Sequence, residues 1–207
     1  MQSATTMEKQ TVLSIYDDIA EWFDFARNKS LFERSCLDFF LSHLPEKASV
    51  LDLGCGTGEP IAQYLISMGR RITGVDGSPR MISFCRKRFP DHEWILQDMR
   101  QFQSPETFDA IIAWDSFFHL NRDDQREMFT VFTKYCRPQG ILLFSSGLEN
   151  GEAWSPMFGH DNARMFHASL DTDEYRALLE KHGFVILKHV QSDLACGGHT
   201  YWIAQKI

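Results

Sequence analysis

The segment Val50–Pro60 reads VLDLGCGTGEP and decides the fold of the chain. Its apolar start, from about Ala48 to Leu53, predicts a short buried strand bounded by glycine. Three glycines follow at every second position, and glycine permits positive φ and lets a ligand lie directly on the backbone. Pro60 suits the first turn of a helix, where its missing N–H is not needed. The segment therefore predicts a strand, a glycine loop and a helix, as in nucleotide-binding α/β folds.

The charge of this loop restricts the ligand that it can hold. The dinucleotide fingerprint is G-x-G-x-x-G, and Glu59 stands where its last glycine would be. A pyrophosphate would lie at the helix N-terminus, where the carboxylates of Glu59 and Asp52 repel it. A cationic ligand without phosphate fits better. S-adenosylmethionine, which carries a sulfonium and an ammonium group, is such a ligand.

Residues Asp52 to Gly58 match the pattern D-x-G-x-G-x-G, and at this point the chain closely resembles the class I S-adenosylmethionine-dependent methyltransferases. The resemblance implies S-adenosylmethionine as cofactor and S-adenosylhomocysteine as product. It also implies cofactor contacts from the first motif, through Asp52, Gly54, Gly56 and Thr57. A lone motif of this kind also fits a glycine-rich turn without chemical importance, so the spacing of later acids decides between the two.

Asp76 ends the expected second strand, 24 residues after Asp52. An acid at this place can accept hydrogen bonds from a ribose diol. Asp76 can also be the acid at the start of the next helix, which Ser78 caps, and the two interpretations are compatible. The resemblance extends the cofactor contacts to Gly77 and Met81.

Asp98 and Met99 follow the expected third strand, His92 to Leu96. Methyltransferases of this family often have an acid here that accepts the adenine amino group, while the next backbone N–H meets a ring nitrogen. The resemblance assigns these two contacts to Asp98 and Met99. The alternative for an isolated Asp after a strand is an ordinary turn residue.

The segment Tyr16–Asp24 reads YDDIAEWFD and resembles the signature Y-D-x-x-A-x-x-Y/F-D of many small-molecule methyltransferases. In that family the N-terminal helix covers the cofactor and shapes the substrate pocket, which implies a role for Tyr16 and Trp22. The alternative is an amphipathic helix that only packs on the core. We expect cover helices over about residues 8–44.

The fourth strand is expected at Phe108–Asp115, which is almost wholly apolar, as a strand covered on both faces should be. The resemblance adds Trp114 and Asp115 to the cofactor site and places the following aromatic and histidine residues along the channel to the methyl group. Methyltransferases that act on DNA bases carry D/N-P-P-Y/F here. This chain has WDSF, which disfavours that substrate class.

The stretch 147–170 carries many aromatic residues and histidines without clear periodicity. A long irregular segment in a compact domain is usually functional, so we expect a lid on the ligand edge of the sheet. Its candidate substrate-pocket residues are Trp154, Phe158, His160 and His167. The alternative is a surface excursion that packs its own aromatics.

Histidine titrates near neutrality and can take a proton from a hydroxyl or amine acceptor. His119 follows the fourth strand and His199 opens the final strand, so these two rank first as catalytic or substrate-orienting groups, ahead of His167. The alternative for each is a hydrogen-bonded structural histidine.

Composition excludes several classes of protein. The chain has 207 residues, 43% of them hydrophobic, which predicts one α/β domain over residues 1–207. Its formal charge of −7 disfavours nonspecific nucleic-acid binding. The five cysteines are scattered without C-x-x-C, and no signal peptide or membrane span stands out, so we expect a cytoplasmic protein with reduced thiols. No zinc pattern, G-x-S-x-G or P-loop occurs.

The expected fold is a Rossmann-like, doubly wound α/β sheet, mostly parallel. Phe184–Val190 and Thr200–Lys206 should form an antiparallel C-terminal hairpin. The family order of strands is 3-2-1-4-5-7-6. The expected function is methyl transfer from S-adenosylmethionine to a small-molecule acceptor by in-line displacement, in a monomer or homodimer. The alternatives are a non-catalytic protein that binds the cofactor and a nicotinamide-dependent oxidoreductase, which Glu59 disfavours.

Overall fold

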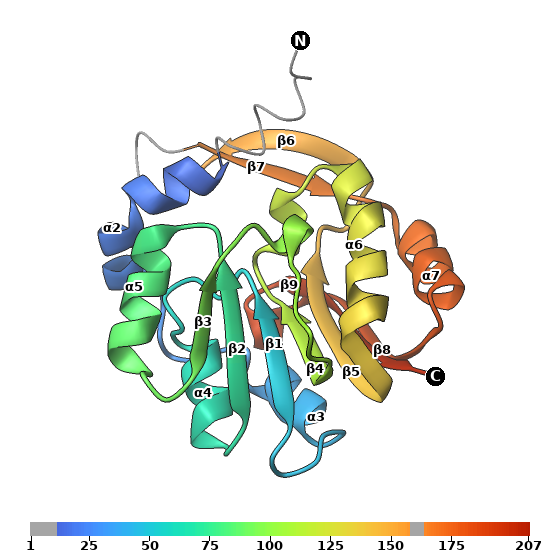
Figure 1. Cartoon of the computed structure of the whole chain (residues 1–207). Helices are drawn as coiled ribbons and strands as arrows, with labels where there is room; N and C mark the ends of the chain where they lie inside the picture. The colour runs from blue at the N-terminus through green and yellow to red at the C-terminus, as the bar shows by residue number, and fades with distance from the viewer. Residues whose placement is uncertain (1–11, 158–163) are drawn as a thin grey trace.

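A seven-stranded sheet with helices on both faces forms the body of the protein (Figure 1). The structure, a computed structural model, describes residues 12–157 and 164–207. The strands of this sheet are β1 (Ser49–Leu53), β2 (Arg71–Asp76), β3 (Glu93–Leu96), β4 (Phe108–Ala113), β5 (Cys136–Ser146), β8 (Phe184–Asp193) and β9 (His199–Lys206). Their spatial order is β3-β2-β1-β4-β5-β9-β8.

The pairing of these strands confirms the predicted topology. Strands β1 to β5 pair in parallel, whereas β9 runs antiparallel to both β5 and β8. Because β8 and β9 are the sixth and seventh strands of this sheet along the chain, the order is the predicted 3-2-1-4-5-7-6. All five parallel strands therefore end at the same edge of the sheet, where ligands bind in folds of this kind.

Two apolar layers cover the sheet. One face packs on α6 (Arg122–Tyr135) and α7 (Thr172–Lys181), and the other packs on α3 (Arg34–Leu41), α4 (Ile61–Ser67) and α5 (Pro79–Arg88). The helix starts follow local capping chemistry, since the Ser78 side chain accepts a hydrogen bond from Met81 N at 3.2 Å. Pro79 occupies the first turn of that helix.

The N-terminal helices lie over the carboxyl edge of the sheet (Figure 1). Residues 12–18 are helical, and α2 (Ala20–Ala26) follows. Asp17 ties the first of these helices to the start of α5, because its carboxylate accepts hydrogen bonds from Ser78 Oγ at 2.6 Å and from Arg80 N at 3.0 Å. These two hydrogen bonds hold the helix of residues 12–18 against the start of α5.

The sequence had led us to expect an irregular stretch over residues 147–170, but the described part of this stretch contains regular structure. It contains a two-stranded antiparallel sheet of β6 (Gly151–Pro156) and β7 (Arg164–Ser169), which arches over the carboxyl ends of the main strands (Figure 1). The alternation of apolar and polar residues that marks a half-buried strand is absent from β7, because Met165 and Phe166, on its opposite faces, are both buried. Two of the predicted substrate-pocket residues, Phe158 and His160, lie outside the described residues.

No helix among residues 12–157 and 164–207 combines the length and the apolar character that crossing a bilayer requires.

Candidate active site

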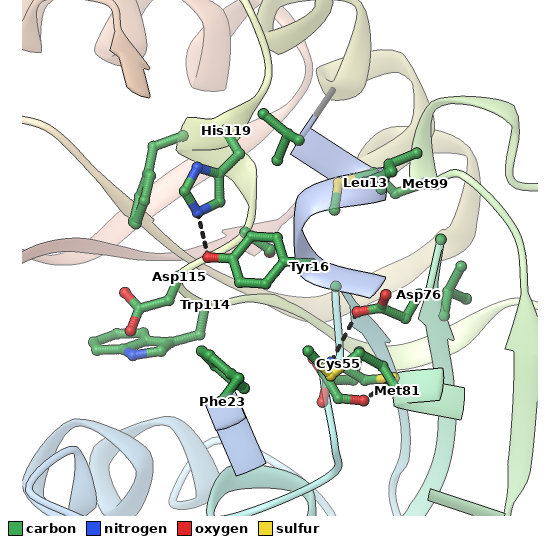
Figure 2. Close-up of a pocket in the computed structure, with 18 of the residues that line it drawn as sticks. Leu13, Tyr16, Phe23, Cys55, Asp76, Met81, Met99, Trp114, Asp115 and His119 are labelled. Carbon is green, nitrogen blue, oxygen red and sulfur yellow. Dashed lines mark hydrogen bonds between the residues drawn. The ribbon is translucent and has the colours of Figure 1, made fainter. Parts of the chain in front are cut away.

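A cavity of about 360 Å³ lies at the carboxyl ends of the parallel strands, beneath the N-terminal helix and the β6–β7 hairpin (Figure 2). We call it the cofactor cavity. It brings together most of the residues singled out from the sequence, which come from seven separate parts of the chain. Those that line it are Tyr16, Asp52, Gly54, Gly56, Thr57, Asp76, Gly77, Met81, Asp98, Met99, Trp114, Asp115, His119, His167 and His199.

The glycine loop leaves β1 in a conformation that only glycine can hold. The amides of Gly54 and Cys55 donate to Val75 O at 2.7 and 3.1 Å, which pins the loop to the end of β2. Gly54 has φ +81°, and a Cβ there would lie 2.2 Å from Ser116 Cβ. The floor of the cavity therefore requires bare backbone at this position.

Asp76 joins this loop to the end of β2. Its Oδ2 accepts a hydrogen bond from Gly56 N at 2.9 Å (Figure 2). Its Oδ1 accepts one from Ser78 N, also at 2.9 Å. Burial raises the pKa of Asp76, while these backbone amides act in the opposite direction. Two carboxylate oxygens have about four acceptor sites, so Asp76 keeps acceptor capacity beyond these amides.

Asp52 adds a second carboxylate to the same floor. It is 4% exposed, and burial together with the charge of Asp76 raises its pKa to about 7. A cation placed beside the pair would relieve both the desolvation and the mutual repulsion.

Glu59 contributes less to the negative electrostatic potential of the cavity than its position in the sequence predicts. Its Oε2 lies 2.7 Å from Lys29 Nζ and 3.4 Å from Arg88 Nη1, so its charge is offset. The repulsion of a pyrophosphate therefore depends on Asp52 and Asp76 rather than on Glu59.

Asp98 reaches the cavity, but Arg100 occupies its carboxylate. The Arg100 guanidinium contacts both carboxylate oxygens of Asp98, and its Nη1 lies 3.0 Å from Asp124 Oδ2. An adenine amino group would share Asp98 with this arginine. Arg100 was not predicted from the sequence, although an arginine two residues from an acid is a visible signal.

The N-terminal helix presents Phe23, and not Trp22, to the cavity. Phe23 meets the Tyr16 ring edge-on, with ring centroids 5.6 Å apart. With 3.6 residues per turn, Phe23 lies within about 20° of Tyr16 around the helix axis and Trp22 about 120° from it, so helical periodicity from Tyr16 selects Phe23. Leu13, on the same helix, packs against Gly77, where a Cβ would lie 2.5 Å from Leu13 Cδ2.

Tyr16 and His119 meet across the cavity, as Figure 2 shows. His119 Nδ1 lies 2.7 Å from Phe166 O, so it carries the proton and donates to this carbonyl. His119 Nε2 is then an acceptor, and Tyr16 OH donates to it at 2.8 Å. Burial lowers the pKa of His119 to about 4, and burial also raises the pKa of Tyr16, so both side chains are neutral at pH 7.

Asp115 and His199 form an ion pair in the same cavity. Asp115 Oδ1 lies 2.8 Å from His199 Nε2, a charge contact rather than a well-aligned hydrogen bond, and His199 Nδ1 donates to Cys196 O at 2.7 Å. Burial opposes the charged form of His199, but the contacts with Asp115 outweigh it and raise the pKa of His199 to about 9. His199 is therefore a cation at neutral pH and in this arrangement does not accept a proton.

Arg27 supports this ion pair from the N-terminal side. Its Nη2 lies 3.7 Å from Asp115 Oδ2 and 2.8 Å from Oε1 of the fully buried Glu33. The two cations near Asp115, Arg27 and His199, thus each have a carboxylate of the protein as partner.

The β6–β7 hairpin closes the remaining side of the cavity. His167 stacks on Phe118, with ring centroids 5.4 Å apart, and lies 4.9 Å from the ring of His119. Trp154 does not line the cavity, because it packs on Phe166 of the partner strand. Met157 and Met165 line it instead, and the sequence analysis did not select either.

Among the residues that the structure describes, no three His, Cys, Asp or Glu side chains gather in a way that could hold a metal ion. The cavity instead combines a carboxylate-lined floor at β1 and β2 with an aromatic end at β4, β7 and β9. This arrangement can hold a cationic, adenosine-like ligand and place an apolar or neutral group beside it.

Comparison with known proteins agrees with the fold and the first motif. Residues 50–140 match a family described as "Methyltransferase domain". The putative methyltransferase YqeM of Bacillus subtilis (strain 168) is 36% identical over 141 residues, which cover 65% of this chain and 53% of that protein. Malonyl-[acyl-carrier protein] O-methyltransferase of Serratia marcescens is 30% identical over 168 residues, 78% of this chain and 64% of that protein. The chain thus spans less than two thirds of either relative.

Solved structures share the whole fold at low identity. The 1,6-didemethyltoxoflavin-N1-methyltransferase of Burkholderia thailandensis superposes with a TM-score of 0.73 at 19% identity, over 100% of this chain and 92% of that one. The magnesium protoporphyrin IX methyltransferase of Synechocystis PCC 6803 gives 0.72 at 16% identity, over 97% of each chain. Together, the family match and the curated relatives support a class I S-adenosylmethionine-dependent methyltransferase, and the solved structures share its fold.

Proposed function

We propose that the protein binds S-adenosylmethionine in the cofactor cavity and transfers its methyl group to a small-molecule acceptor. The observation that carries the proposal is the placement of Asp52, Asp76 and Asp98 at the ends of three adjacent parallel strands, around a glycine loop. The first two carboxylates suit a ligand with positive charge, and the free acceptor capacity of Asp76 suits a ribose diol.

Bound S-adenosylmethionine supplies an electrophilic methyl carbon, and the protein supplies position and a dry environment. The aromatic end of the cavity, with Tyr16, Phe23 and Trp114, excludes water from the acceptor. Holding nucleophile and methyl carbon in line is the largest contribution that an enzyme can make to such a displacement.

Proton transfer plays a smaller part in this proposal. His199 is already protonated at neutral pH, and the lone pair of His119 Nε2 accepts the Tyr16 hydroxyl. With a pKa of about 4, His119 is a weak base. The site therefore suits an acceptor that is nucleophilic without prior deprotonation, such as a neutral amine.

The acceptor does not follow from the relatives, because their printed substrates differ widely. They include a malonyl-[acyl-carrier protein] and trans-aconitate among the curated relatives, and a magnesium porphyrin and an amino pentose among the solved structures. A screen of metabolites that follows S-adenosylhomocysteine release addresses the acceptor directly.

Calorimetry with Asp76→Ala tests the cofactor site. Loss of a hydrogen-bonded carboxylate should weaken S-adenosylhomocysteine binding by about 1.5–3 kcal/mol, roughly ten- to a hundredfold. The matched control is Asp91→Ala, which removes an exposed carboxylate outside the cavity. Unchanged affinity in folded Asp76→Ala would refute the ribose assignment.

Thermal shift separates the proposal from its rivals. A native-state ligand stabilises by about 2.7 kcal/mol at a hundredfold excess over its Kd. We expect stabilisation by S-adenosylmethionine and S-adenosylhomocysteine and none by NAD. Stabilisation by NAD alone would favour an oxidoreductase, and binding of the cofactor without any turnover across the metabolite screen would favour a binding protein.

A further inference from the structure

A buried carboxylate lies next to Arg27, outside the lining of the cofactor cavity. It belongs to Glu33, which immediately precedes α3 and is fully buried. Its Oε1 lies 2.8 Å from Arg27 Nη2, whereas its Oε2 has no hydrogen-bond partner within the described residues. A buried charge is costly unless it is paired, so Glu33 depends on Arg27 for its compensation.

The same nitrogen of Arg27 faces a second carboxylate. Arg27 Nη2 lies 3.7 Å from Asp115 Oδ2, which is 0.9 Å farther than its contact with Glu33. The other oxygen of Asp115, Oδ1, lies 2.8 Å from His199 Nε2. These four residues form a row of alternating charge, which we call the charge network. Because Coulomb attraction falls with distance, Arg27 is held mainly by Glu33, and Asp115 is left to His199.

Aromatic packing holds His199 at the end of this network. Its imidazole stacks on the Phe32 ring, with centroids 5.6 Å apart and an interplanar angle of 23°, and lies 5.1 Å from the Trp114 ring. Phe32 is adjacent to Glu33 in the connection from α2 to α3. One short segment therefore supplies both the ring that positions His199 and the carboxylate that holds Arg27.

Some further titratable groups surround the Asp115–His199 pair. They are Tyr16, Cys36, His119, His167, Asp193 and Cys196. Burial lowers the pKa of His167, as it does for His119, so both imidazoles are neutral at pH 7. A hydrogen bond from Cys36 and the charge of His199 lower the pKa of Cys196, although burial opposes this. None of these groups is changed in the variants below, so their effect on His199 is common to all of them.

We propose that Glu33 is a positioning residue that keeps His199 charged during the proposed methyl transfer, on which this inference rests. It does so by holding Arg27, which leaves Asp115 to His199. Without the charge of Glu33, Arg27 and His199 compete for Asp115. An arginine keeps its proton in this competition, whereas an imidazole loses its proton near neutral pH. His199 would then present a neutral base to the acceptor instead of a positive charge.

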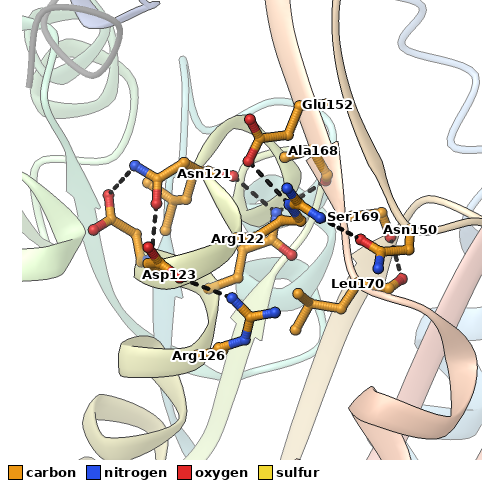
Figure 3. Close-up of polar contacts among 12 residues, drawn as sticks. Asn121, Arg122, Asp123, Arg126, Asn150, Glu152, Ala168, Ser169 and Leu170 are labelled. Atoms are coloured by element: carbon orange, nitrogen blue, oxygen red, sulfur yellow. Dashed lines mark hydrogen bonds and ion pairs between the residues drawn. The ribbon is translucent and has the colours of Figure 1, made fainter. Parts of the chain in front are cut away.

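The chain offers a matched control on α6. Arg126 also lies between a glutamate and an aspartate, with its Nε 2.6 Å from Glu174 Oε1. Its Nη1 lies 2.8 Å from Asp123 Oδ1 (Figure 3). None of these three residues lines the cofactor cavity. Glu174→Gln therefore takes one carboxylate from an arginine without changing the charge beside His199.

The test is the pKa of His199, measured by NMR titration of protein labelled in its histidines. The His199 signal is the one that His199→Gln lacks. Glutamine keeps the shape of Glu33 and removes its charge. A neighbouring charge shifts a pKa by about 1–3 units, so Glu33→Gln should lower the pKa of His199 by about 1 unit or more. Glu174→Gln should leave it at the wild-type value. An unchanged pKa in folded Glu33→Gln would overturn the proposal.

Arg27→Gln separates charge competition from packing. If Arg27 competes with His199 for Asp115, its removal should leave the pKa of His199 at or above the wild-type value. The double variant Arg27→Gln/Glu33→Gln should restore the wild-type value. A lowered pKa in either variant would overturn the proposal, because packing and not competition would then set the charge. The double variant also decides the question if Glu33→Gln does not fold, since a neutral pair in place of a buried ion pair is often tolerated.

Turnover links the charge of His199 to the reaction. With an acceptor from the metabolite screen, kcat of Glu33→Gln should fall at a pH about 1 unit lower than kcat of the wild type. Identical pH profiles, with the pKa of His199 lowered, would overturn the positioning role. The NMR titration needs no cofactor, whereas failure of the wild type to bind S-adenosylhomocysteine in calorimetry would contradict the proposed function itself. The two failures are therefore distinguishable.

Discussion

The two ends of the cofactor cavity are built in different ways. At the cofactor end, Asp76 and Asp98 are held by groups close to them in the chain, such as Ser78 N for Asp76 and the Arg100 side chain for Asp98. At the acceptor end, the contacts join distant segments. Tyr16 bonds His119, which lies 103 residues away, and His119 bonds the Phe166 carbonyl 47 residues further on.

This difference explains why one end is visible as a motif and the other is not. Contacts over two to twenty residues require fixed spacing, and that spacing is written in the sequence. Contacts between distant segments leave no such pattern, because any two residues can meet once the fold brings them together. Substitutions that alter the backbone or the charge should therefore impair the cofactor end. Substitutions that remove side-chain contacts should impair the acceptor end.

The largest effect is expected from Gly54→Ala, which breaks the backbone of the cofactor end. The added Cβ would lie 2.2 Å from Ser116 Cβ at a φ of +81°, so the loop must move. We expect loss of S-adenosylhomocysteine binding by calorimetry and a destabilisation above about 4 kcal/mol in denaturant unfolding.

Gly183→Ala is the matched control for this variant, since Gly183 also has positive φ but nothing within 4 Å of an added Cβ. It should cost only about 1 kcal/mol from the backbone conformation. Equal effects of the two substitutions would show that φ alone, and not the contact with Ser116, limits residue 54.

Asp52→Asn tests charge at the cofactor end. The pKa of Asp52 is raised to about 7, so below that pH the wild-type carboxylate takes up a proton and a cationic ligand should bind more weakly. The variant should bind S-adenosylmethionine roughly ten- to a hundredfold more weakly at pH 8, with a flatter pH profile measured by calorimetry between pH 5 and 8.

The ligand-free protein should respond in the opposite direction. An acid with a raised pKa destabilises the fold when ionised, so the contribution of Asp52 to stability should rise as pH falls from about 8 toward 4. At pH 8, Asp52→Asn should have a higher Tm than the wild type, by about 2–4 °C for each 1 kcal/mol relieved. If Asp52→Asn has a lower Tm than the wild type at pH 8, the Asp52 carboxylate is not a buried, unpaired charge in the ligand-free protein.

His199→Gln tests the ion pair at the acceptor end. The pKa of His199 is raised to about 9, so its stabilising contribution is complete below about pH 6.5 and disappears as pH rises through 9. We expect the variant to lose roughly 1–2 kcal/mol near pH 6 and almost nothing near pH 10, as measured by urea unfolding. A loss independent of pH would indicate packing rather than charge.

The same variant and His119→Ala should lower turnover, once an acceptor is known, at least about tenfold, or about 1.4 kcal/mol. Affinity for S-adenosylhomocysteine should stay near the wild-type value in both. Wild-type turnover in both variants would show that the acceptor needs neither histidine.

The smallest effect is expected from Arg122→Gln, which loosens the hairpin. The Arg122–Glu152 pair is partly exposed, at 39% and 36%, so its loss should cost about 0–1 kcal/mol. Amide exchange in Gly151–Pro156 should rise without a change in cofactor affinity. Arg71→Gln, which breaks the more exposed pair with Glu106, is the control and should leave this exchange unchanged.

Some residues and elements of this protein could be predicted from the sequence, and others could not. The glycine loop, Asp76 and the strand order could be predicted because each follows from spacing or apolar runs. Phe23 rather than Trp22 lines the cavity, and β7 was hidden because Met165 and Phe166, on its two faces, are both buried. Arg27 was missed because its partner Asp115 is distant in the sequence and meets it only in the folded chain. Arg100 was missed although its partner Asp98 lies only two residues away.

By itself, the sequence determined the α/β sheet, its antiparallel end and the carboxylate-lined cofactor end, since short-range spacing and hydrophobic runs specify strands, loops and caps. Only the tertiary structure decided the protonation of the histidines, because burial leaves His119 neutral while Asp115 keeps His199 charged. It also decided which aromatic residues face the cavity. Burial and the pairing of charges depend on which distant segments meet, and no local pattern encodes that.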